Sequence, residues 1–442
     1  MASLLLLAFA ALPIHAPTVP PSPADIAQEG LRRQEERARE QQQHLKPDAD
    51  LLQAAKPTTI SDKLPEESPC FPIQGVELTG PDAAKFAWLA DAALPYLRQC
   101  AGAAGLRQIA SALDARLIEQ GYVTSRASLP QQNLKEGILT IRLHVGRIAG
   151  ISMNQAGNPK APDAAWGTWR NAFPVSDGDI LNVRDLEQGV EQMKRLPSQA
   201  VATELEPGEE PDTSRLRILR ILRQAGTFRQ RLRGGITLDN SGSRAVGKPQ
   251  LSAYASLDNA LGLNDIFSLS ANSNIESLRP DHRSQSLNLQ YTIPWGYNTF
   301  TLSRSHNRFA QVVQGTTARF LSNGSSDSAD LRWHRILLRT SSAKAGAYAL
   351  VGTRRASSYL DDVELIVQRR RTTNLETGIT YKQLLGAASV DLEIGHRQGI
   401  NWRGAQDDLP TAAEGGLTVR PTITVASAGL SLPFTLAGRP ML

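Results

Sequence analysis

The sequence contains 442 residues, of which 48 are Lys or Arg and 43 are Asp or Glu, so its formal net charge is only +5. Basic and acidic side chains are interleaved along the chain, which argues against the concentrated basic surface of a nucleic-acid-binding protein. After the N-terminus, no apolar run reaches the ~18 residues of a membrane-spanning helix, but a domain that crosses a membrane with strands needs no such run.

The N-terminal segment predicts export. Residues 1–16 are mostly apolar and end at the small residue Ala16, as in a secretory signal peptide, although the positively charged start of such a signal is missing. A true start upstream of Met1 would explain the missing charge. The alternative is a buried helix, which the Pro-rich sequence that follows disfavours.

A polar helix is predicted over residues 23–45. Its charged, Gln-rich sequence has only Ile26, Leu31 and Leu45 as large apolar residues, too few to form a stripe that packs on a core. Such a helix must be solvated or lie in a polar channel. Residues 46–68 carry several prolines and mixed charges and are interpreted as a linker.

Cys70 and Cys100 are the only two cysteines. In an exported chain a single pair predicts a disulfide, which would stabilise the fold by about 3 kcal/mol in the chain-entropy model. The alternative is two small buried residues. Two cysteines without a cluster of histidines exclude a structural zinc site, and no metal or cofactor is expected.

Two small α+β modules are predicted in tandem. Between residues 69 and 146 the order is strand, helix, helix, strand, strand, with a helix over 103–120 that ends at Gly121. In "GILTIRLHVG" the apolar side chains alternate with polar ones, as in a half-buried strand.

The same order is predicted again over residues 147–223. Residues 163–172 are weakly helical, and Asn182 begins a second helix with Asp185 three residues later. The segments "AVATELEP" and "SRLRILRILR" complete the unit as strands, so each module should contain a three-stranded sheet.

From about residue 229 to 442, helical periodicity disappears and strand periodicity replaces it. In "SQSLNLQYTI", Leu287 and Leu289 lie on one face while Ser286 and Asn288 lie on the other. Ten such segments are predicted, at 231–238, 250–257, 266–275, 285–293, 298–305, 329–338, 345–353, 373–382, 388–396 and 421–432.

The apolar faces of these segments predict a transmembrane barrel rather than a soluble sandwich. Connections alternate between tight and long, with a long loop expected between 306 and 329, and short turns at one rim with long loops at the other are typical of membrane barrels. Trp295 and Tyr297 follow a strand where an aromatic girdle at the membrane interface would lie. In the sandwich alternative the apolar faces would pack against a second sheet.

Four stretches together resemble one family. They are "SPCFPIQGVELTG" with "IEQGYVTSRASLPQQNLKEGILTIRLHVGRI", then "VRDLEQGVEQMKRLPSQAVATELEPGEEPDTSRLRI", "GGITLDNSGSRAVGKPQLSAYASLDNALGLNDIFSLS" and "YLDDVELIVQRRRTTNLETGITY". They resemble the two POTRA modules and the barrel strands of two-partner secretion transporters. These are the haemolysin secretion/activation proteins of the ShlB, FhaC and HecB type, the TpsB branch of the Omp85 superfamily.

The resemblance implies a fold and an activity. The fold is an N-terminal helix that plugs the barrel, two periplasmic POTRA modules and a 16-stranded barrel in the Gram-negative outer membrane. The activity is export of one large secreted partner, a haemolysin or filamentous adhesin, without ATP or a proton gradient. The partners are then this exoprotein and outer-membrane lipid, and not nucleic acid. The polar helix at 23–45 fits such a water-filled barrel.

One departure from the family pattern concerns the C-terminal part. Members carry a [VI]-R-G-[YF] motif on a loop folded into the barrel and further strands after it. Here "LTVRPTIT" has Pro421 where that glycine would stand, and about six of the sixteen strands are missing. A fragment or a frameshifted copy is therefore expected, with doubtful export activity, because an open sheet has unpaired edges in lipid.

Candidate binding residues follow from strand addition, in which an extended chain pairs with a free sheet edge. The expected edge in the first module is the strand formed by Tyr122, Val123, Thr124, Ser125, Arg126, Ala127 and Ser128. The alternative is that this strand only completes its own sheet. The residues Asp239, Asn240, Ser241, Gly242, Asp258 and Asn259 are interpreted as barrel-onset turns rather than as calcium ligands.

Three other functions remain as alternatives. An outer-membrane enzyme would need a nucleophile and a base, but no G-x-S-x-G or H-E-x-x-H motif occurs, so no catalytic residue is proposed. A barrel-assembly insertase of the same superfamily usually carries more POTRA modules. A simple porin has no reason to carry two α/β modules.

Overall fold

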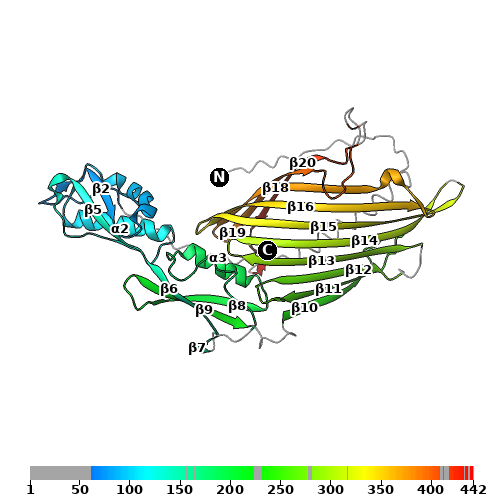
Figure 1. Ribbon diagram of the computed structural model, residues 1–442, viewed down its shortest axis with the longest axis horizontal. Helices are drawn as coiled ribbons and strands as arrows, with labels where there is room; N and C mark the ends of the chain where they lie inside the picture. The colour runs from blue at the N-terminus through cyan, green and yellow to red at the C-terminus, as the bar shows by residue number, and fades with distance from the viewer. Residues whose placement is uncertain are drawn as a thin grey trace.

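The computed structural model describes residues 61–155, 158–162, 166–222, 231–276, 281–315, 317–408, 412, 418–432, 434–436 and 439–441. Three parts follow one another along its long axis: a first module (residues 61–146), a second module (147–222) and a large sheet (232–431) (Figure 1). The predicted signal at 1–16 and the predicted polar helix at 23–45 lie outside the described residues.

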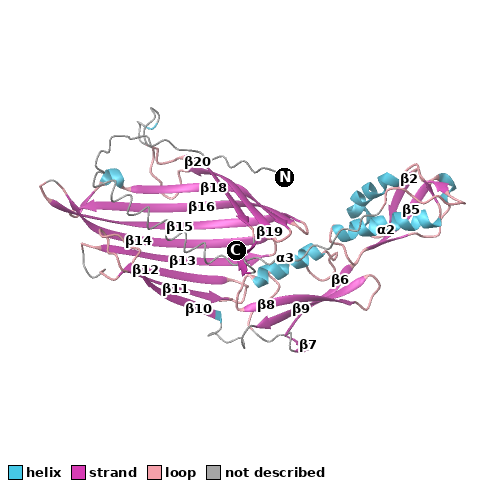
Figure 2. Cartoon of the chain, turned by 180° about the vertical axis from the view of Figure 1, so that it is seen from behind, coloured by secondary structure: helices cyan, strands magenta, loops and turns pink. Residues whose placement is uncertain are grey.

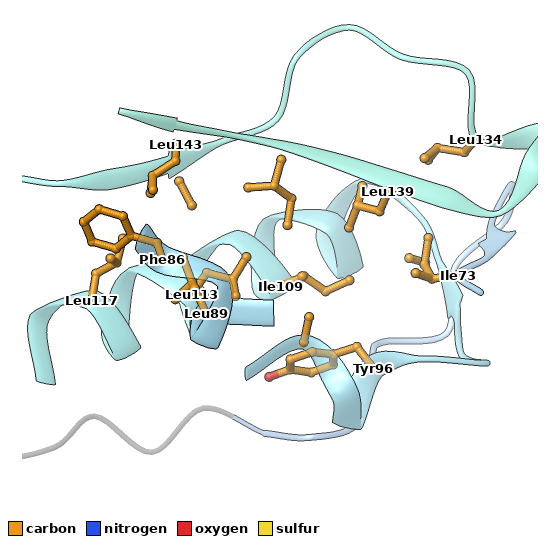
Figure 3. Close-up of a cluster of buried hydrophobic side chains, with 14 of the residues drawn as sticks. Ile73, Phe86, Leu89, Tyr96, Ile109, Leu113, Leu117, Leu134, Leu139 and Leu143 are labelled. Carbon is orange, nitrogen blue, oxygen red and sulfur yellow. The ribbon is translucent and has the colours of Figure 1, made fainter. Parts of the chain in front are cut away.

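The first module packs two helical segments against a three-stranded sheet of order β2-β5-β4. Its apolar core joins the buried face of β5 to the predicted face of α2, and includes Ile109, Leu113, Leu139 and Leu143 (Figure 3). The region 81–98, expected to be helical, forms a run of tight 3-10 turns kinked at Phe86 and containing Pro95. The elements are β1 (Phe71–Pro72), β2 (Gly75–Thr79), η1 (Ala83–Tyr96), β3 (Cys100–Ala101), α2 (Ala103–Glu119), β4 (Arg126–Ser128), η2 (Leu134–Glu136) and β5 (Ile138–His144).

The end of the predicted linker belongs to the first module instead. Leu64 packs against the core of this module, and the Glu67 carboxylate accepts hydrogen bonds of 2.8 Å from the backbone N–H groups of Ala104 and Gly105. These are unpaired donors at the start of α2, where Gly102 offers no side-chain cap. Part of the segment 61–68 therefore belongs to the first module, because Leu64 contacts its core and Glu67 caps the start of α2.

Glu67 gives the first module a measurable pH dependence. The two backbone N–H donors hold the pKa of Glu67 below its ordinary value of 4.5, so the stabilisation is present above that pH and is lost as the pH falls through the lower folded value. We expect protection of the Ala104 and Gly105 amides from hydrogen exchange to fall on acidification, and Glu67→Gln to remove most of this dependence. Equal acid sensitivity in both proteins would contradict this role.

The second module has a four-stranded sheet of order β7-β6-β9-β8 with one helix, α3, packed on it. The three-stranded expectation was wrong because β7 folds back onto β6 as an additional edge strand. Asn182 caps α3 as predicted, accepting a hydrogen bond of 2.9 Å from the Arg184 N–H. The elements are β6 (Arg147–Gln155), β7 (Asn158–Pro162), α3 (Val183–Lys194), β8 (Gln199–Pro207) and β9 (Thr213–Leu222).

The expected weak helix at 163–172 is wrong for its described part. Residues 166–172 form turns, with Gly167 at φ 117°. The Trp169 carbonyl accepts the N–H groups of Ala172 and Phe173, as in a single turn that is not continued. Several other polar groups of this segment bond to the large sheet, as described below.

All ten predicted strand segments overlap strands of the large sheet, which runs in chain order from β10 to β20 with only antiparallel neighbours (Figures 1 and 2). No pairing of β10 with β20 occurs among the described residues. The strands are β10 (Leu232–Asp239), β11 (Gln250–Asp258), β12 (Ile266–Asn274), β13 (Arg283–Trp295), β14 (Asn298–Gln314), β15 (Arg319–Arg339), β16 (Ala343–Leu360), β18 (Arg370–Leu385), β19 (Ala388–Gly399) and β20 (Thr422–Ser431).

Short elements accompany this sheet. The strand β17 pairs with the end of β16, η3 follows it, and β21 and β22 form a separate hairpin. Their bounds are β17 (Val363–Glu364), η3 (Ile366–Gln368), β21 (Phe434–Leu436) and β22 (Arg439–Met441).

The long loop expected between 306 and 329 is wrong. The strands β14 and β15 continue as a paired ladder as far as Gln314 opposite Arg319. The apolar alternation of β14 stops after Leu302, because Arg304, His306 and Arg308 follow it on the same face. Backbone pairing continues, since it does not depend on the polarity of the side chains. The sequence pattern therefore showed only the apolar part of these strands.

Large apolar side chains on one face of the sheet are exposed, whereas many polar side chains on the other face are buried. Leu302, Leu331 and Ile379 are 47%, 52% and 62% exposed, whereas Ser268, Asn288 and Thr292 on the opposite face are buried. The two buried apolar clusters lie in the two modules, so in the described part of the chain no second sheet packs on these leucines. This excludes the sandwich alternative. None of the helices described is both long and apolar enough to cross a membrane.

Candidate functional site

Three turns at one end of the large sheet contact the second module. They connect β11 to β12, β13 to β14 and β15 to β16, and α3 lies against this end of the strands (Figures 1 and 2). We call this set of contacts the junction. It fixes the second module to the sheet through polar groups rather than through an apolar core.

The first turn begins at Asp258 and Asn259, two of the predicted barrel-onset residues. Asp258 is fully buried, bonded at 2.7 Å to Arg233 and at 3.0 Å to the Ser198 N–H of the second module. The Trp166 indole N–H donates to the Asn259 carbonyl at 3.0 Å, and the Asn259 side chain donates back to the Trp166 carbonyl at 3.1 Å. These residues do form a turn, but they also hold the second module.

The second turn, between β13 and β14, is held by side chains of α3. Gln188 and Gln192 both donate to the Gly296 carbonyl at 3.2 Å, while the Gly296 N–H donates to the Asn171 carbonyl at 2.7 Å. Gly296 has a φ of 56°, a left-handed conformation that favours glycine. The glycine therefore lets the turn adopt the conformation in which its carbonyl accepts both glutamines of α3.

Tyr297 in this turn does not face lipid, which corrects the interface prediction for this residue. Its hydroxyl donates to the Asp185 carboxylate in α3. Burial and this carboxylate raise the pKa of Tyr297, and burial also raises the pKa of Asp185. Tyr297 therefore helps to dock the second module onto the sheet. Trp295 is 60% exposed, and its role at the membrane interface stays a prediction.

The third turn carries a buried cluster of charges, which we call the junction ion cluster: Glu187 and Glu191 of α3 with Arg339 and Lys344 of the sheet. Glu191 lies 2.6 Å from both cations, and Arg339 also lies 3.4 Å from Glu187. The Arg339 side chain is only 3% exposed. Burial alone would raise the pKa of Glu191, but Lys344 and Arg339 outweigh it and hold that pKa below its ordinary value. Glu191 therefore stays ionised at neutral pH.

A cavity of about 860 Å³ lies where both modules meet the third turn. The first module contributes Trp88 and Tyr122, α3 contributes Asp185, and the end of β15 contributes Leu337 and Leu338. Both leucines are more than half exposed. Apolar surface surrounded by charged groups is typical of a binding site for another molecule.

The predicted edge Tyr122–Ser128 is a strand only at its end, which corrects the prediction. The strand β4 spans Arg126–Ser128, and Tyr122 instead packs its ring on Phe86, with centroids 4.8 Å apart. β4 is the outer strand of its sheet as expected, but the Asp114 carboxylate already accepts the Ala127 N–H at 2.6 Å. Little of this edge is open to a partner strand.

The remaining predicted residues lie away from the junction. Cys70 and Cys100 are joined by a disulfide with their Cα atoms 5.4 Å apart. The turn at Asp239–Gly242 lies at the opposite end of the sheet, where the Asp239 carboxylate accepts the Ser241 N–H at 2.8 Å. In the described ranges, no three His, Cys, Asp or Glu side chains come together as metal ligands.

The polar face of the sheet holds a second polar network, centred on the buried residues Tyr348 and Glu376, that the sequence did not reveal. The Tyr348 hydroxyl donates to Glu376 at 2.7 Å, and Arg397 bonds the same carboxylate at 2.6 Å. The Arg332 guanidinium lies over the Tyr348 ring at 3.9 Å from its centroid and pairs with Glu393 at 3.0 Å. This wall of the sheet is therefore polar but internally compensated.

Comparison with known proteins supports the same architecture. Residues 219–442 match the family model described as haemolysin secretion/activation protein ShlB/FhaC/HecB, residues 71–146 match a POTRA domain of the ShlB type, and residues 147–207 match a POTRA domain. The solved structure of CdiB from Escherichia coli has a TM-score of 0.75 and 25% identity, covering 94% of this chain and 74% of that one.

Curated relatives match over most of the chain. The outer membrane transporter CdiB-2 of Burkholderia pseudomallei is 34% identical over 393 residues, 85% of this chain and 65% of that protein. The hemolysin transporter protein ShlB of Serratia marcescens is 28% identical over 367 residues, 82% of this chain and 61% of that protein. The chain thus spans slightly less than two thirds of these relatives' lengths.

Proposed function

The chain belongs to the haemolysin secretion/activation family of ShlB, FhaC and HecB, and from this premise we propose that it exports a large secreted partner protein by two-partner secretion. It is an outer-membrane protein, as the named relatives are, with its POTRA modules in the periplasm. The proposed partner is of the haemolysin or filamentous adhesin type. The protein acts as a conduit in this proposal and catalyses no reaction.

The cavity at the junction is the observation that carries the proposal. It lies on the periplasmic side and is lined by both modules and by the end of β15. A chain bound there would therefore lie beside the periplasmic ends of the strands. The leucines and aromatic rings suit the apolar side chains of an unfolded partner, and the charges suit its polar backbone. The polar face of the strands offers a wetted path beyond it.

Replacing both cavity leucines tests the proposal. We expect Leu337→Asp with Leu338→Asp to reduce the partner in the culture medium about tenfold or more, because burying each leucine against a bound chain is worth roughly 1.5–3 kcal/mol. The assay expresses the chain with a large exported protein of the haemolysin or adhesin type, in a strain without another such transporter, and measures the secreted protein by immunoblot.

The matched control is Ile118→Asp, which changes a half-exposed residue of α2 that does not line the cavity. Secretion should be unchanged in this variant. Undiminished secretion by the double leucine variant would exclude the cavity as the binding site, and absence of secretion by the unchanged chain would contradict the proposed function itself.

A further inference from the structure

A groove rich in arginine lies on the exposed face of the large sheet. It has a volume of about 250 Å³, and five of its eleven lining residues are arginines, with one carboxylate. These are Arg304, Arg354, Arg355, Arg371, Arg403 and Asp327. Such an excess of cations on a membrane protein requires an explanation that the export function does not supply.

The strand register places most of these residues on the lipid-facing side. Arg304 follows Leu302 by two residues on β14, and Arg371 precedes Leu375 by four on β18, so each shares a face with an exposed leucine. Arg355 lies directly opposite Arg371 and therefore shares their face. The groove thus continues the apolar surface rather than the polar wall.

The groove lies at the border of the apolar surface that is farther from the modules. Arg403 lines it from residues 400–408, which follow β19 at the strand ends opposite the junction and bond to Arg371 and Thr373 of β18. The modules are periplasmic, so this border faces the outer leaflet. Trp402 is half exposed, with the Arg403 guanidinium 5.7 Å from its ring centroid, as expected for an interfacial tryptophan.

The cations in the groove outnumber its one carboxylate, Asp327, which lies directly opposite Arg355 on the neighbouring strand. Like charges directly opposite on neighbouring strands, as at Arg355 and Arg371, destabilise a sheet. Within the described ranges, no ion pair joins Arg304, Arg355, Arg371 or Arg403 to a carboxylate. Asp327, the one acid, lies 2.8 Å from His306. A multivalent anion between the arginines would remove this repulsion.

We propose that this groove binds the phosphate groups of the phosphorylated glycolipid of the outer leaflet, with acyl chains lying over Leu302 and Leu331. Guanidinium groups form paired hydrogen bonds to phosphate, which an ammonium group cannot match. The position at the edge of the apolar surface places the arginines at the depth of lipid headgroups. The inference rests on the membrane location and is independent of partner export.

Lipid binding by purified variants tests the proposal. Native mass spectrometry in detergent is used with bisphosphorylated lipid A, with dephosphorylated lipid A and with phosphatidylglycerol. We expect one bisphosphorylated lipid A to bind and to raise the thermal midpoint, and both Arg355→Ser and Arg371→Ser to weaken that binding about tenfold each. Arg335→Ser, on the same face of β15 near the junction, should bind lipid as the unchanged protein does.

Several results would overturn the proposal. Unchanged binding of lipid A by the variant carrying both substitutions would exclude the groove. Equal binding of the dephosphorylated lipid or of phosphatidylglycerol would exclude recognition of the glycolipid phosphates, and equal thermal stabilisation by inorganic phosphate alone would show an ion site without lipid specificity. The unfolding midpoint of the lipid-free variants verifies folding, because removing like charges should leave it unchanged or higher.

Discussion

Glu191→Ala should detach the second module from the large sheet. The change removes the only carboxylate within 4 Å of Lys344 among the described residues and leaves Arg339 with the longer contact to Glu187. Removing one partner from a buried ion pair costs roughly 3–5 kcal/mol, because the remaining cations stay buried without their counterion. We expect hydrogen-exchange protection across α3 to fall strongly, and export of the partner to be lost.

A double-mutant cycle separates coupling from simple truncation. Glu191→Ala with Lys344→Ala should cost less than the sum of the two single changes, because the second change removes one of the cations that the first leaves unpaired. Glu204→Ala is the matched control: this glutamate of the same module is half exposed and lies 3.7 Å from Arg217, so the expected cost is below about 1 kcal/mol. Additive costs in the cycle would show that the junction ion cluster does not couple the two parts.

The elements that periodicity specifies could be predicted from the sequence. The helix α2, the strand β5 and the ten strand segments all carry long apolar patterns, and each lies where the pattern predicted. The side of the sheet that faces lipid followed from the same pattern, because small and mid-sized apolar residues repeat on every strand. The extent of β14 and β15 could not be predicted, since their ends pair without apolar side chains.

The junction could not be predicted because its residues have ordinary local roles as well. Asp258 and Asn259 suit a turn, and Tyr297 after a strand suits a membrane interface. Whether such residues also bind a distant module depends on which elements the fold brings together. The one available signal was the charge pattern of α3, whose glutamates at 187 and 191 lie one helical turn apart and align with one side of the helix.

Both polar networks follow from the same physical situation. Each contains a charged side chain that is only a few per cent exposed, Arg339 at the junction and Glu376 on the polar face, and such a charge must be compensated by pairing because water does not reach it. The junction ion cluster does so between parts of the chain, and the Tyr348 network does so within the wall. Substitutions in the junction ion cluster should weaken the docking of the second module, whereas substitutions in the Tyr348 network should lower the stability of the sheet itself.

Gly395→Ala should destabilise the sheet by about 1–3 kcal/mol, the usual cost of overpacking. A Cβ atom at Gly395 would lie 2.2 Å from the Tyr348 hydroxyl oxygen and 3.2 Å from Glu376 Oε1. The tyrosine cannot move freely, because Arg332 covers its ring and Glu376 holds its hydroxyl. Urea unfolding of the protein in lipid vesicles, followed by tryptophan fluorescence, measures the loss.

Tyr348→Phe should restore most of the stability that Gly395→Ala removes. If Gly395→Ala weakened the sheet in a general way, the second change would restore nothing. Without the hydroxyl oxygen, the nearest ring atom would be 3.3 Å from the new methyl group, a contact that small shifts can relieve. Alone, Tyr348→Phe should cost only about 1 kcal/mol, since Arg397 still pairs with Glu376. Gly429→Ala in β20 is the control, because its nearest neighbour would be 3.9 Å away. If the double variant is as unstable as the sum of its parts, the glycine is not required to seat the tyrosine ring.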